Sequence, residues 1–352
     1  MNGRAPTQTG FTLVEIMVSM VIGLLLVAGV VALAATGSQG NRQIERQVRQ
    51  IENGRFAIDV LSDHLRHAGF YGGLYPPVAP MPALPAALPD PCGAATPTFA
   101  EDGMRLFLQG LDSPAGDPAG SCLTDADHVD GTDIVTIRRA GTLARTPAYA
   151  AGRSALFLQA AAGDYRLDLG TQADPDADGF GITQSNAAGV QVAAPLRDWQ
   201  VETFYVAPRT RPVDATPCDG DQSDAGRPIP TLMRLRLAGS AWCAEPLAAG
   251  IEMLQIEYGI DTSNNGIPNQ FEEQPDNPQE WADVVGLRLY LLARTQQPLG
   301  AATDPKTYRL GEGVPGPNGT DDFTPPAGDG HKRHLFTSTV RLANPAGRRE
   351  KP

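Results

Sequence analysis

The sequence predicts an α+β protein in which one long amino-terminal helix packs on an antiparallel β-sheet domain. Three observations lead to this class: an apolar run from Phe11 to Ala35, an amphipathic pattern that continues from it, and a series of short β-type runs in the rest of the 352 residues. No long helical pattern separates those runs, so parallel βαβ units are not expected. The sheet should therefore be antiparallel.

The run from Phe11 to Ala35 has the length and composition of a helix that crosses a membrane. Glu15 is its only charged residue, and about 20 apolar residues span a hydrocarbon core of about 30 Å. A secretory signal peptide would have a shorter apolar run, with its cleavage site behind it. The expected cut lies before the run, after Gly10, so cleavage would leave the helix in the mature protein.

The amphipathic pattern predicts that the helix continues beyond the membrane. Apolar residues recur at steps of three and four with charged residues between them; they are Ile44, Val48, Ile51, Ile58, Leu61, Leu65 and Ala68. No proline interrupts the chain between Pro6 and Pro76, and the glycines from Gly69 onward supply a stop. The apolar stripe would cover one face of the sheet.

Short runs of alternating or β-branched residues predict the strands. They lie at 104–108, 134–138, 155–159, 199–206, 232–237, 253–260, 284–294 and 335–342. The expected domain organisation is a leader at 1–10, a membrane helix at 11–36, an amphipathic helix at 37–72, a Pro-rich crossing segment at 73–100, a β-rich domain at 101–343 and a tail at 344–352.

Composition and motifs exclude two broad classes of function. A net charge of −12 does not suit a nucleic-acid surface, which needs clustered Lys and Arg. The sequence has no GxSxG, SxxK or Cys-His signature of nucleophilic catalysis and no Walker A motif. Neither an enzyme nor an assembly ATPase is therefore expected.

The four cysteines predict disulfides, not a zinc or redox site. None of them has the CxxC spacing that such sites use, and a domain moved across the inner membrane meets an oxidising compartment. Four cysteines allow three connectivities. The local pairing, Cys92 with Cys122 and Cys218 with Cys243, is preferred.

The segment from Asp261 to Glu272 matches a twelve-residue calcium loop at most positions. The ligands would be Asp261, Ser263, Asn265, the carbonyl of Ile267, Asn269 and Glu272. Two features weaken the match, because Ser263 replaces the usual Asp or Asn and the loop follows a strand, not a helix. The alternative is an Asn-Gly turn between strands. No cofactor is required, and Ca²⁺ at this loop is the ion that the sequence suggests.

The two ends of the chain resemble known pilus proteins. The leader MNGRAPTQTG, the Gly10-Phe11 junction, the TLVE that follows and the long apolar run resemble a type IV prepilin signal. Residues 52–72 and three carboxyl-terminal segments, LAAGIEMLQIEYGIDTSNNG, WADVVGLRLYLLAR and KRHLFTSTVRLAN, resemble the PilW family of minor pilins. The resemblance covers about 10–75 and 245–345, and the residues at 76–240 carry no motif that aligns.

This resemblance implies a pilin-like fold and roles for three residues. A prepilin peptidase would cut between Gly10 and Phe11 and methylate the new amine of Phe11. Glu15 would meet the amino terminus of a neighbouring subunit when helices bundle in a filament. A carboxylate within a membrane helix persists only if it is paired or functional. The alternative for Glu15 is an interfacial position near the helix end.

The implied function is that of a minor pilin. Such a protein sits in the inner membrane with a periplasmic domain, joins other minor pilins and the major pilin, primes type IV pilus assembly and ends at the pilus tip, where a tip adhesin is a further partner. Twitching motility and adhesion depend on such pili. Two alternatives stay open: a minor pseudopilin of a type II secretion system, and a signal-anchored periplasmic binding or enzyme domain.

Overall fold

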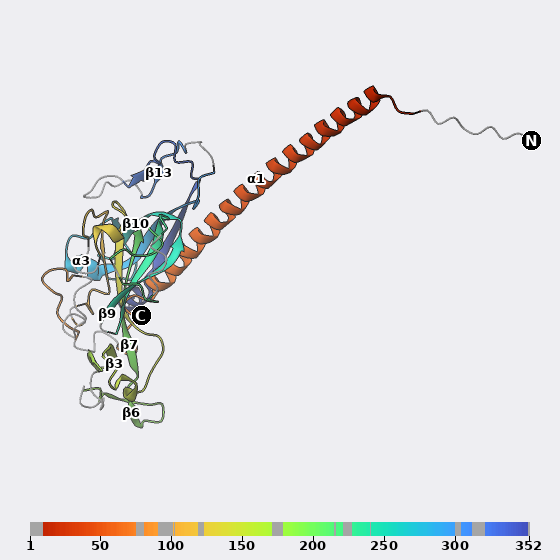
Figure 1. The fold of residues 1–352 in the computed structure, drawn as a ribbon. Coiled ribbons are helices and arrows are strands. Elements are labelled where there is room, and N and C mark those ends of the chain that lie inside the picture. The colour runs from red at the N-terminus through yellow and green to blue at the C-terminus, as the bar shows by residue number, and fades with distance from the viewer. Residues whose placement is uncertain are drawn as a thin grey trace, which may run out of the picture. The chain divides into compact units, whose positions relative to one another are not determined.

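The computed structural model describes residues 10–74, 81–90, 101, 103–118, 123–170, 179–214, 216–220, 227–239, 241–299, 304–311 and 321–350. The chain divides into two compact units, Met1–Arg49 and Gln50–Pro352, and each is described by itself. The expected α+β class is confirmed, since a long amino-terminal helix is followed by antiparallel sheets (Figure 1).

Helix α1 runs from Leu13 to Arg66 and passes from the first unit into the second. Two short helices, α3 (Pro278–Asp283) and α4 (Ala343–Arg349), and two 3-10 turns, η1 (Asp125–Asp127) and η2 (Pro147–Ala150), lie in the second unit. The absence of proline between Pro6 and Pro76 permits the length of α1, because proline would remove a helical hydrogen bond.

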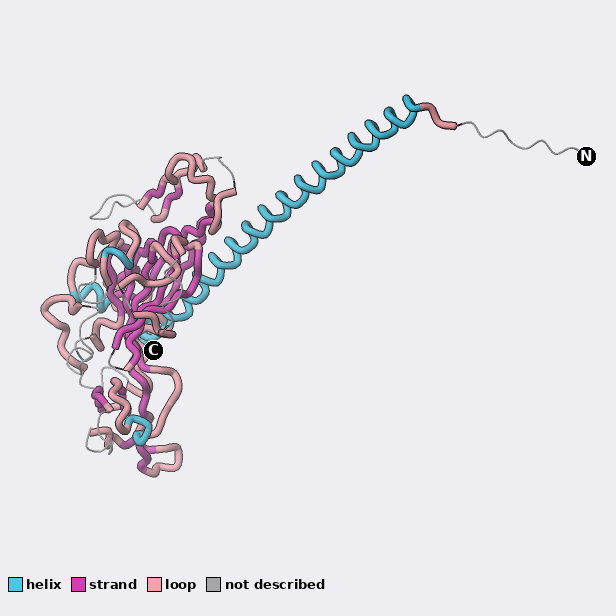
Figure 2. The backbone as a smooth tube through the Cα atoms, in the orientation of Figure 1, coloured by secondary structure: helices cyan, strands magenta, loops and turns pink. Residues whose placement is uncertain are grey.

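Strands of the second unit form two main sheets (Figure 2), in which every pairing between strands is antiparallel. The seven-stranded sheet has the path β1-β2-β7-β3-β4, and β8 lies between β7 and β9. Its strands are β1 (Leu108–Leu111), β2 (Ile134–Ala140), β3 (Leu156–Ala161), β4 (Asp164–Leu169), β7 (Leu196–Ala207), β8 (Thr231–Ala238) and β9 (Ala241–Ala249).

The four-stranded sheet has the order β11-β10-β12-β15. Its strands are β10 (Ile251–Ile260), β11 (Gln270–Glu272), β12 (Val284–Arg294) and β15 (Arg333–Arg341). Two small pairs complete the described strands: β5 (Thr183–Ser185) with β6 (Gln191–Ala193), and β13 (Tyr308–Arg309) with β14 (Asp322–Phe323).

One hydrophobic core joins the carboxyl-terminal part of α1 to both main sheets. Ala57, Ile58, Leu61 and Leu65 of the helix belong to the same buried cluster as Ile137, Val201 and Phe204 of the first sheet and Leu254, Leu287 and Leu289 of the second. A fully buried leucine contributes about 1.5–3 kcal/mol relative to an exposed one. Ile51, although it belongs to the expected apolar stripe, is exposed.

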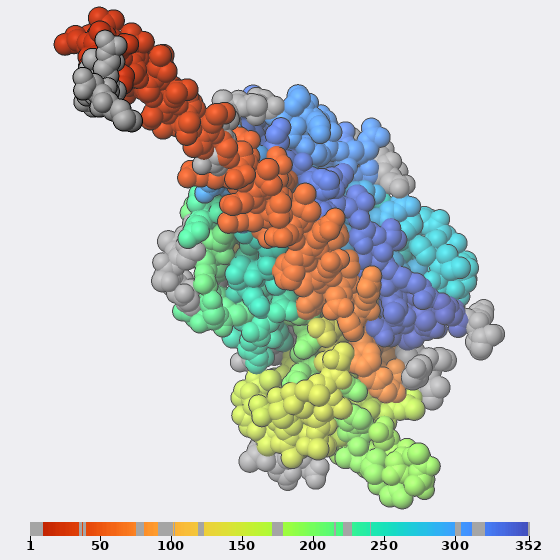
Figure 3. Space-filling view, turned by 90° about the vertical axis from the view of Figure 1, so that its right-hand side faces the viewer, coloured from red at the N-terminus to blue at the C-terminus, as the bar shows by residue number. Residues whose placement is uncertain are grey.

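Polar contacts fix the helix between the sheets at the start of the second unit. The Gln50 amide donates to the carbonyls of Ala293 at 2.7 Å and Lys332 at 2.9 Å. The Asn53 amide donates to the carbonyl of Ala249 in β9 at 2.8 Å. Figure 3 shows this part of α1, in orange, with the green strands β8 and β9 on one side and the blue strand β15 on the other.

The expected strands at 134–138, 199–206, 232–237, 253–260 and 284–294 fall within β2, β7, β8, β10 and β12. Those at 155–159 and 335–342 each extend one residue beyond β3 and β15. The expected strand at 104–108 is wrong, because β1 begins only at Leu108. The apolar residues Met104 and Leu106 are buried in irregular backbone instead. Side chains satisfy their carbonyls there: Tyr71 donates to Met104, and Arg138 donates to Leu106.

The residues expected to form a tail, 344–352, include helix α4, which packs at the end of α1. The Asn344 amide donates to the carbonyl of Ala68 at 3.2 Å, and the Arg348 guanidinium donates to that of Gly69 at 2.8 Å. A helix end leaves carbonyls without partners inside the helix. Helix α4 supplies hydrogen-bond donors for the carbonyls at this helix end. The two segments are far apart in sequence, so no local pattern reveals the pairing.

Gly54 marks the closest approach of α1 to β15, and its substitution tests the packing. A Cβ atom at Gly54 would lie 2.1 Å from the ring of Phe336. We expect Gly54→Ala to destabilise the chain by about 1–2 kcal/mol, because overpacking outweighs the helical preference of alanine. Denaturant unfolding of the detergent-solubilised chain measures this change.

Gly40→Ala is the matched control, because no atom lies within 4 Å of a Cβ placed there. That substitution should be neutral or stabilising by up to about 1 kcal/mol. In a Phe336→Ala background the cost of Gly54→Ala should disappear. Equal effects of the two glycine substitutions would contradict the packing of α1 on β15.

Candidate functional site

The amino-terminal segment carries the residues expected to be processed. Gly10 and Phe11 precede α1, and the Phe11 side chain is 84% exposed. Among the described residues, one helical stretch, Leu13–Ala34, is long and apolar enough to cross a membrane, and none of it is buried within the protein. Its large apolar side chains are therefore available to a lipid or to other helices.

Glu15 has a structural partner that the sequence analysis missed. Its carboxylate accepts hydrogen bonds from both the backbone N–H and the hydroxyl of Thr12, each at 2.9 Å, and the Glu15 N–H donates to the Thr12 hydroxyl at 3.3 Å. This reciprocal pattern is a capping box, and the signal that could have predicted it is Thr-x-x-Glu at the start of an apolar run. Glu15 therefore helps to begin α1.

The disulfide between Cys218 and Cys243 is confirmed. It joins the segment before β8 to strand β9, beside a backbone bridge in which the N–H of Cys218 donates to the carbonyl of Ala244 at 2.9 Å. The expected partners Cys92 and Cys122 lie outside the described residues.

The loop after β10 is held by its own backbone donors. The Asp261 carboxylate accepts from the N–H groups of Ser263 and Gly266, at 3.1 and 2.8 Å, and the Asn269 amide oxygen accepts from the N–H of Thr262 at 3.0 Å. Burial would raise the pKa of Asp261, but these hydrogen bonds and the charge of Arg349 lower it. The Asp261 oxygens thus already have donors.

The remaining expected calcium ligands are dispersed around the same turn. The Asn265 amide oxygen accepts from the N–H of Ile267 at 2.9 Å. Glu272 stands in β11 opposite Tyr258, and its carboxylate accepts from the Gln270 amide. These contacts support the Asn-Gly turn that the sequence left as the alternative. Calcium binding by this loop stays a prediction.

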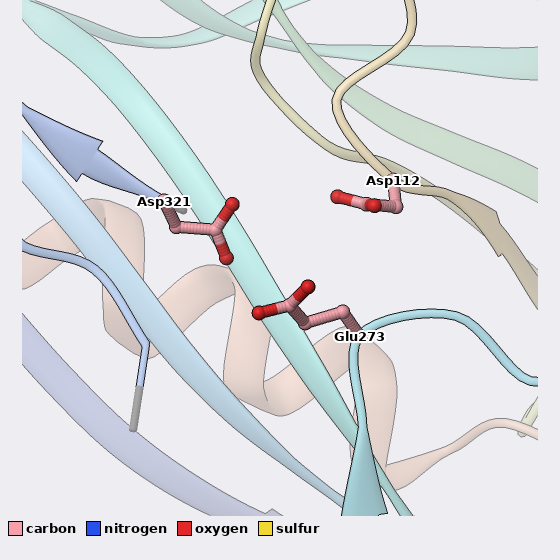
Figure 4. Close-up of side chains that lie close together, drawn as sticks. All are labelled: Asp112, Glu273 and Asp321. Atoms are coloured by element: carbon pink, nitrogen blue, oxygen red, sulfur yellow. The ribbon is translucent and has the colours of Figure 1, made fainter. Parts of the chain in front are cut away.

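A different set of carboxyl groups does converge, as Figure 4 shows. Asp112 follows β1, Glu273 follows β11 and Asp321 precedes β14, and one oxygen from each lies within 4.8 Å of the others. Asp112 and Glu273 are buried. A fourth carboxylate, that of Glu257 in β10, binds Arg288 at 3.2 Å. No sequence motif links residues so far apart.

Electrostatic repulsion is evident in this acidic cluster, by which we mean Asp112, Glu257, Glu273 and Asp321. Burial, with the neighbouring charges of Asp321, Asp112 and Glu257, raises the pKa of Glu273 to about 7. Burial, with the charges of Asp112 and Glu257, raises the pKa of Asp321 to about 6. Near neutral pH the cluster therefore favours either bound protons or a bound cation.

A second ionic cluster lies beneath α1, and here a carboxylate is surrounded by basic side chains. The buried Glu202 of β7 accepts from His64 of α1 at 2.9 Å and from Arg234 of β8 at 2.9 Å, and it pairs with Arg139 of β2 at 3.2 Å. Burial would raise the pKa of Glu202, but its hydrogen bond with His64 and the nearby positive charges outweigh burial and hold the pKa at about 2. The cluster joins the helix to three strands.

Comparisons with known proteins place these features in context. Residues 220–344 match the family described as Type IV Pilus-assembly protein W, and residues 6–31 match the prokaryotic N-terminal methylation motif. A solved structure of a type IV-like pilin from Thermus thermophilus is similar at 13% identity and a TM-score of 0.35, over 84% of this chain and 96% of that one. A search of curated proteins gives no match.

Acid unfolding should report the loss of the Glu202 pairs. The pKa of Glu202 is lower in the folded protein than the ordinary value of 4.5 that applies to the unfolded chain. This difference stabilises the folded protein at pH values above 4.5, and the stabilisation is lost as the pH falls towards 2. Glu202→Gln should cost about 3 kcal/mol at pH 7, because it takes the carboxylate partner from the largely buried Arg139 and one of two carboxylate partners from Arg234. It should also flatten the fall in stability between about pH 5 and 2, measured by denaturant unfolding.

Glu245→Gln is the control, because Glu245 binds the same Arg234 at 2.7 Å but is far more exposed than Glu202. Its cost should stay below about 1 kcal/mol. If both substitutions lower the free energy of unfolding equally, and neither changes its fall between about pH 5 and 2, then Glu202 does not join the helix to the sheet as described.

Proposed function

We propose that this chain, which matches the PilW family of the type IV pilus class, is a minor pilin that primes filament assembly within a complex of minor pilins at the pilus tip. The observation that carries this proposal is the pairing of two features in one chain. A methylation motif and an exposed apolar helix stand at the amino terminus, and the PilW match covers 220–344 at the other end.

The apolar half of α1 supports assembly by helix bundling. Large apolar side chains along Leu13–Ala34 are exposed, and nothing in the described part of the chain buries that stretch. Such a surface requires lipid before assembly and other pilin helices after it. The partners we propose are therefore the inner membrane, the prepilin peptidase, the other minor pilins, the major pilin and a tip adhesin.

The second unit is proposed to act as a cap on the helix bundle, without catalysis. Its described polar clusters, around Glu202 and around Glu273, consist of ion pairs and carboxyl groups. The matching family is a structural family of pilus assembly. Before assembly we place this unit in the periplasm, where the disulfide between Cys218 and Cys243 can form.

The PilW match favours the pilus over the secretion machine that sequence analysis left open. Both machines use the same kind of processed amino terminus, so the methylation motif does not separate them. Deletion of the gene should reduce surface pili and twitching and leave type II secretion unchanged. The opposite pattern would assign the chain to the secretion system.

We expect Gly10→Val to block processing. Glycine before the cut fits the peptidase because it has no side chain, and valine at the same place would obstruct access to the Gly10-Phe11 bond. An unprocessed precursor should accumulate in the inner membrane, and piliation should fall. Intact mass spectrometry of the wild type should show a chain that begins at methylated Phe11. A mature mass that the substitution leaves unchanged would rule out this cleavage site.

Glu15→Val should insert normally, because it makes the membrane helix more apolar, yet it should fail to support pili. The proposal is that Glu15 neutralises the amine of a neighbouring subunit. Co-purification with the other minor pilins and counts of surface pili measure this role. Wild-type pilus numbers with Glu15→Val would overturn it.

Two further variants separate assembly from helix capping. Glu15→Gln keeps an acceptor for Thr12 but removes the charge, because glutamine also serves in a capping box. Thr12→Val removes the hydroxyl of the cap and keeps the charge. The assembly role predicts that Glu15→Gln fails and Thr12→Val works. The reverse result would mean that Glu15 acts through the capping box alone.

A further inference from the structure

Four segments that are distant in sequence bring carboxyl groups to one place in the second unit. One ligand oxygen each from Asp112, Glu273 and Asp321 lies within 4.8 Å of the others, and Figure 4 shows the three groups turned towards a common space. A Cβ atom placed on Gly311 would lie 3.4 Å from Asp321 Oδ2, 3.5 Å from Glu257 Oε1 and 3.9 Å from Glu273 Oε1. Gly311 therefore leaves this space open.

Glu273 supplies the observation that points to a ligand. The residue is 9% exposed, and its Oε2 atom is buried without a hydrogen-bond donor among the described residues. An ionised carboxylate in such a place costs much free energy unless a cation or a donor compensates it. Among the described residues no Lys or Arg forms an ion pair with Glu273 or Asp321, while Arg288 lies against Glu257.

We propose that Asp112, Glu273 and Asp321 bind one divalent cation, and that the cation is Ca²⁺. Carboxylate oxygens are the ligands that hard divalent cations prefer. Two oxygens on opposite sides of one ion are separated by twice the metal–oxygen distance, about 4.6–5.2 Å for Ca²⁺ and about 4.0–4.2 Å for Mg²⁺. The three ligand atoms lie within 4.8 Å of one another, so one Ca²⁺ ion can contact all of them. We choose Ca²⁺ over Mg²⁺ because Mg²⁺ usually keeps several waters and binds only one or two carboxylates.

Glu257 adds negative charge beside the ion without being a ligand. Its Oε2 atom binds Arg288 and the Tyr290 hydroxyl, each at 3.2 Å, and its Oε1 atom faces Gly311. The three ligands come from the ends of β1 and β11 and from the start of β14. A bound ion would thus tie the β13–β14 pair to both main sheets.

The competing arrangement is a proton shared between the Glu273 and Asp321 carboxyl groups, which form a hydrogen bond when one is protonated. The raised pKa values mean that the folded protein binds these protons more tightly than the unfolded chain does. Without a cation, stability should therefore fall as the pH rises from about 5 to about 8. A bound ion would remove this loss, because it replaces the protons.

Thermal unfolding of the full chain in detergent tests the proposal. The chain is freed of metal with a chelator, dialysed at pH 8 and titrated with CaCl₂ or MgCl₂. Calcium at about 100 times its dissociation constant should raise the Tm by about 5 °C, and magnesium at the same concentration should raise it far less. Isothermal titration calorimetry of the Asp261→Asn variant, which removes a predicted ligand from the loop after β10, should give one calcium per chain.

The double variant Glu273→Gln/Asp321→Asn is the decisive comparison. The double variant removes two ligands and also the repulsion between them. Without metal at pH 8 its Tm should therefore be equal to or above that of the wild type. Such a Tm would show that the variant folds. The calcium shift should be lost. Asp261→Asn, in the loop after β10, should keep the full shift, because its carboxylate is not a ligand of this site.

Three results would overturn the proposal. The first is an equal rise in Tm with magnesium, and the second is a calcium-induced rise in Tm that persists in the double variant. The third is a wild-type protein whose Tm does not change with calcium at pH 8 but whose stability still falls from pH 5 to 8. The last result would establish the shared proton instead.

Discussion

The docking of the second half of α1 into one core with both sheets is the contact on which the rest of the second unit depends. Leu61 and Leu65 are completely buried there, together with Phe204 of one sheet and Leu289 of the other. The helix therefore covers two sheets with a single apolar stripe. Removal of a buried leucine from such a site costs about 2–5 kcal/mol, a large share of the stability of a typical domain.

Buried charge fixes where the helix sits, because apolar packing alone tolerates sliding. Glu202 binds His64 of the helix together with Arg139 and Arg234 of the sheet. A shift of the helix by one turn would remove His64 from Glu202 and from the Arg234 guanidinium, which lies 3.3 Å from the His64 ring. The buried Arg138 acts similarly at the helix end: its carbonyl accepts from the N–H of Gly69, and its guanidinium donates to Leu106. Unpaired buried charge costs more than lost contact area, so these groups specify one register.

Periodic patterns explain what could be predicted from the sequence. The helix and strands such as β10 and β12 follow from local alternation, because each residue's environment depends on its near neighbours. The expected strand at 104–108 failed because buried apolar residues also occur in irregular backbone, where Tyr71 and Arg138 satisfy the carbonyls. Helix α4 and the Glu202 cluster depend on partners far along the chain, so the sequence pattern gives no sign of them. The Glu15 capping box was local and could have been predicted.

The two acidic sites differ in where their carboxylate oxygens find hydrogen-bond donors. A loop such as 261–272 brings backbone N–H groups along with its carboxylate, and the Asp261 oxygens accept from Ser263 and Gly266. The oxygens are thereby satisfied without an ion. In the acidic cluster the carboxyl groups come from separate segments, and the buried Oε2 atom of Glu273 accepts no hydrogen bond from a described residue. The need for a cation is therefore greatest where residues distant in sequence meet, which is also where the sequence shows no spacing to recognise.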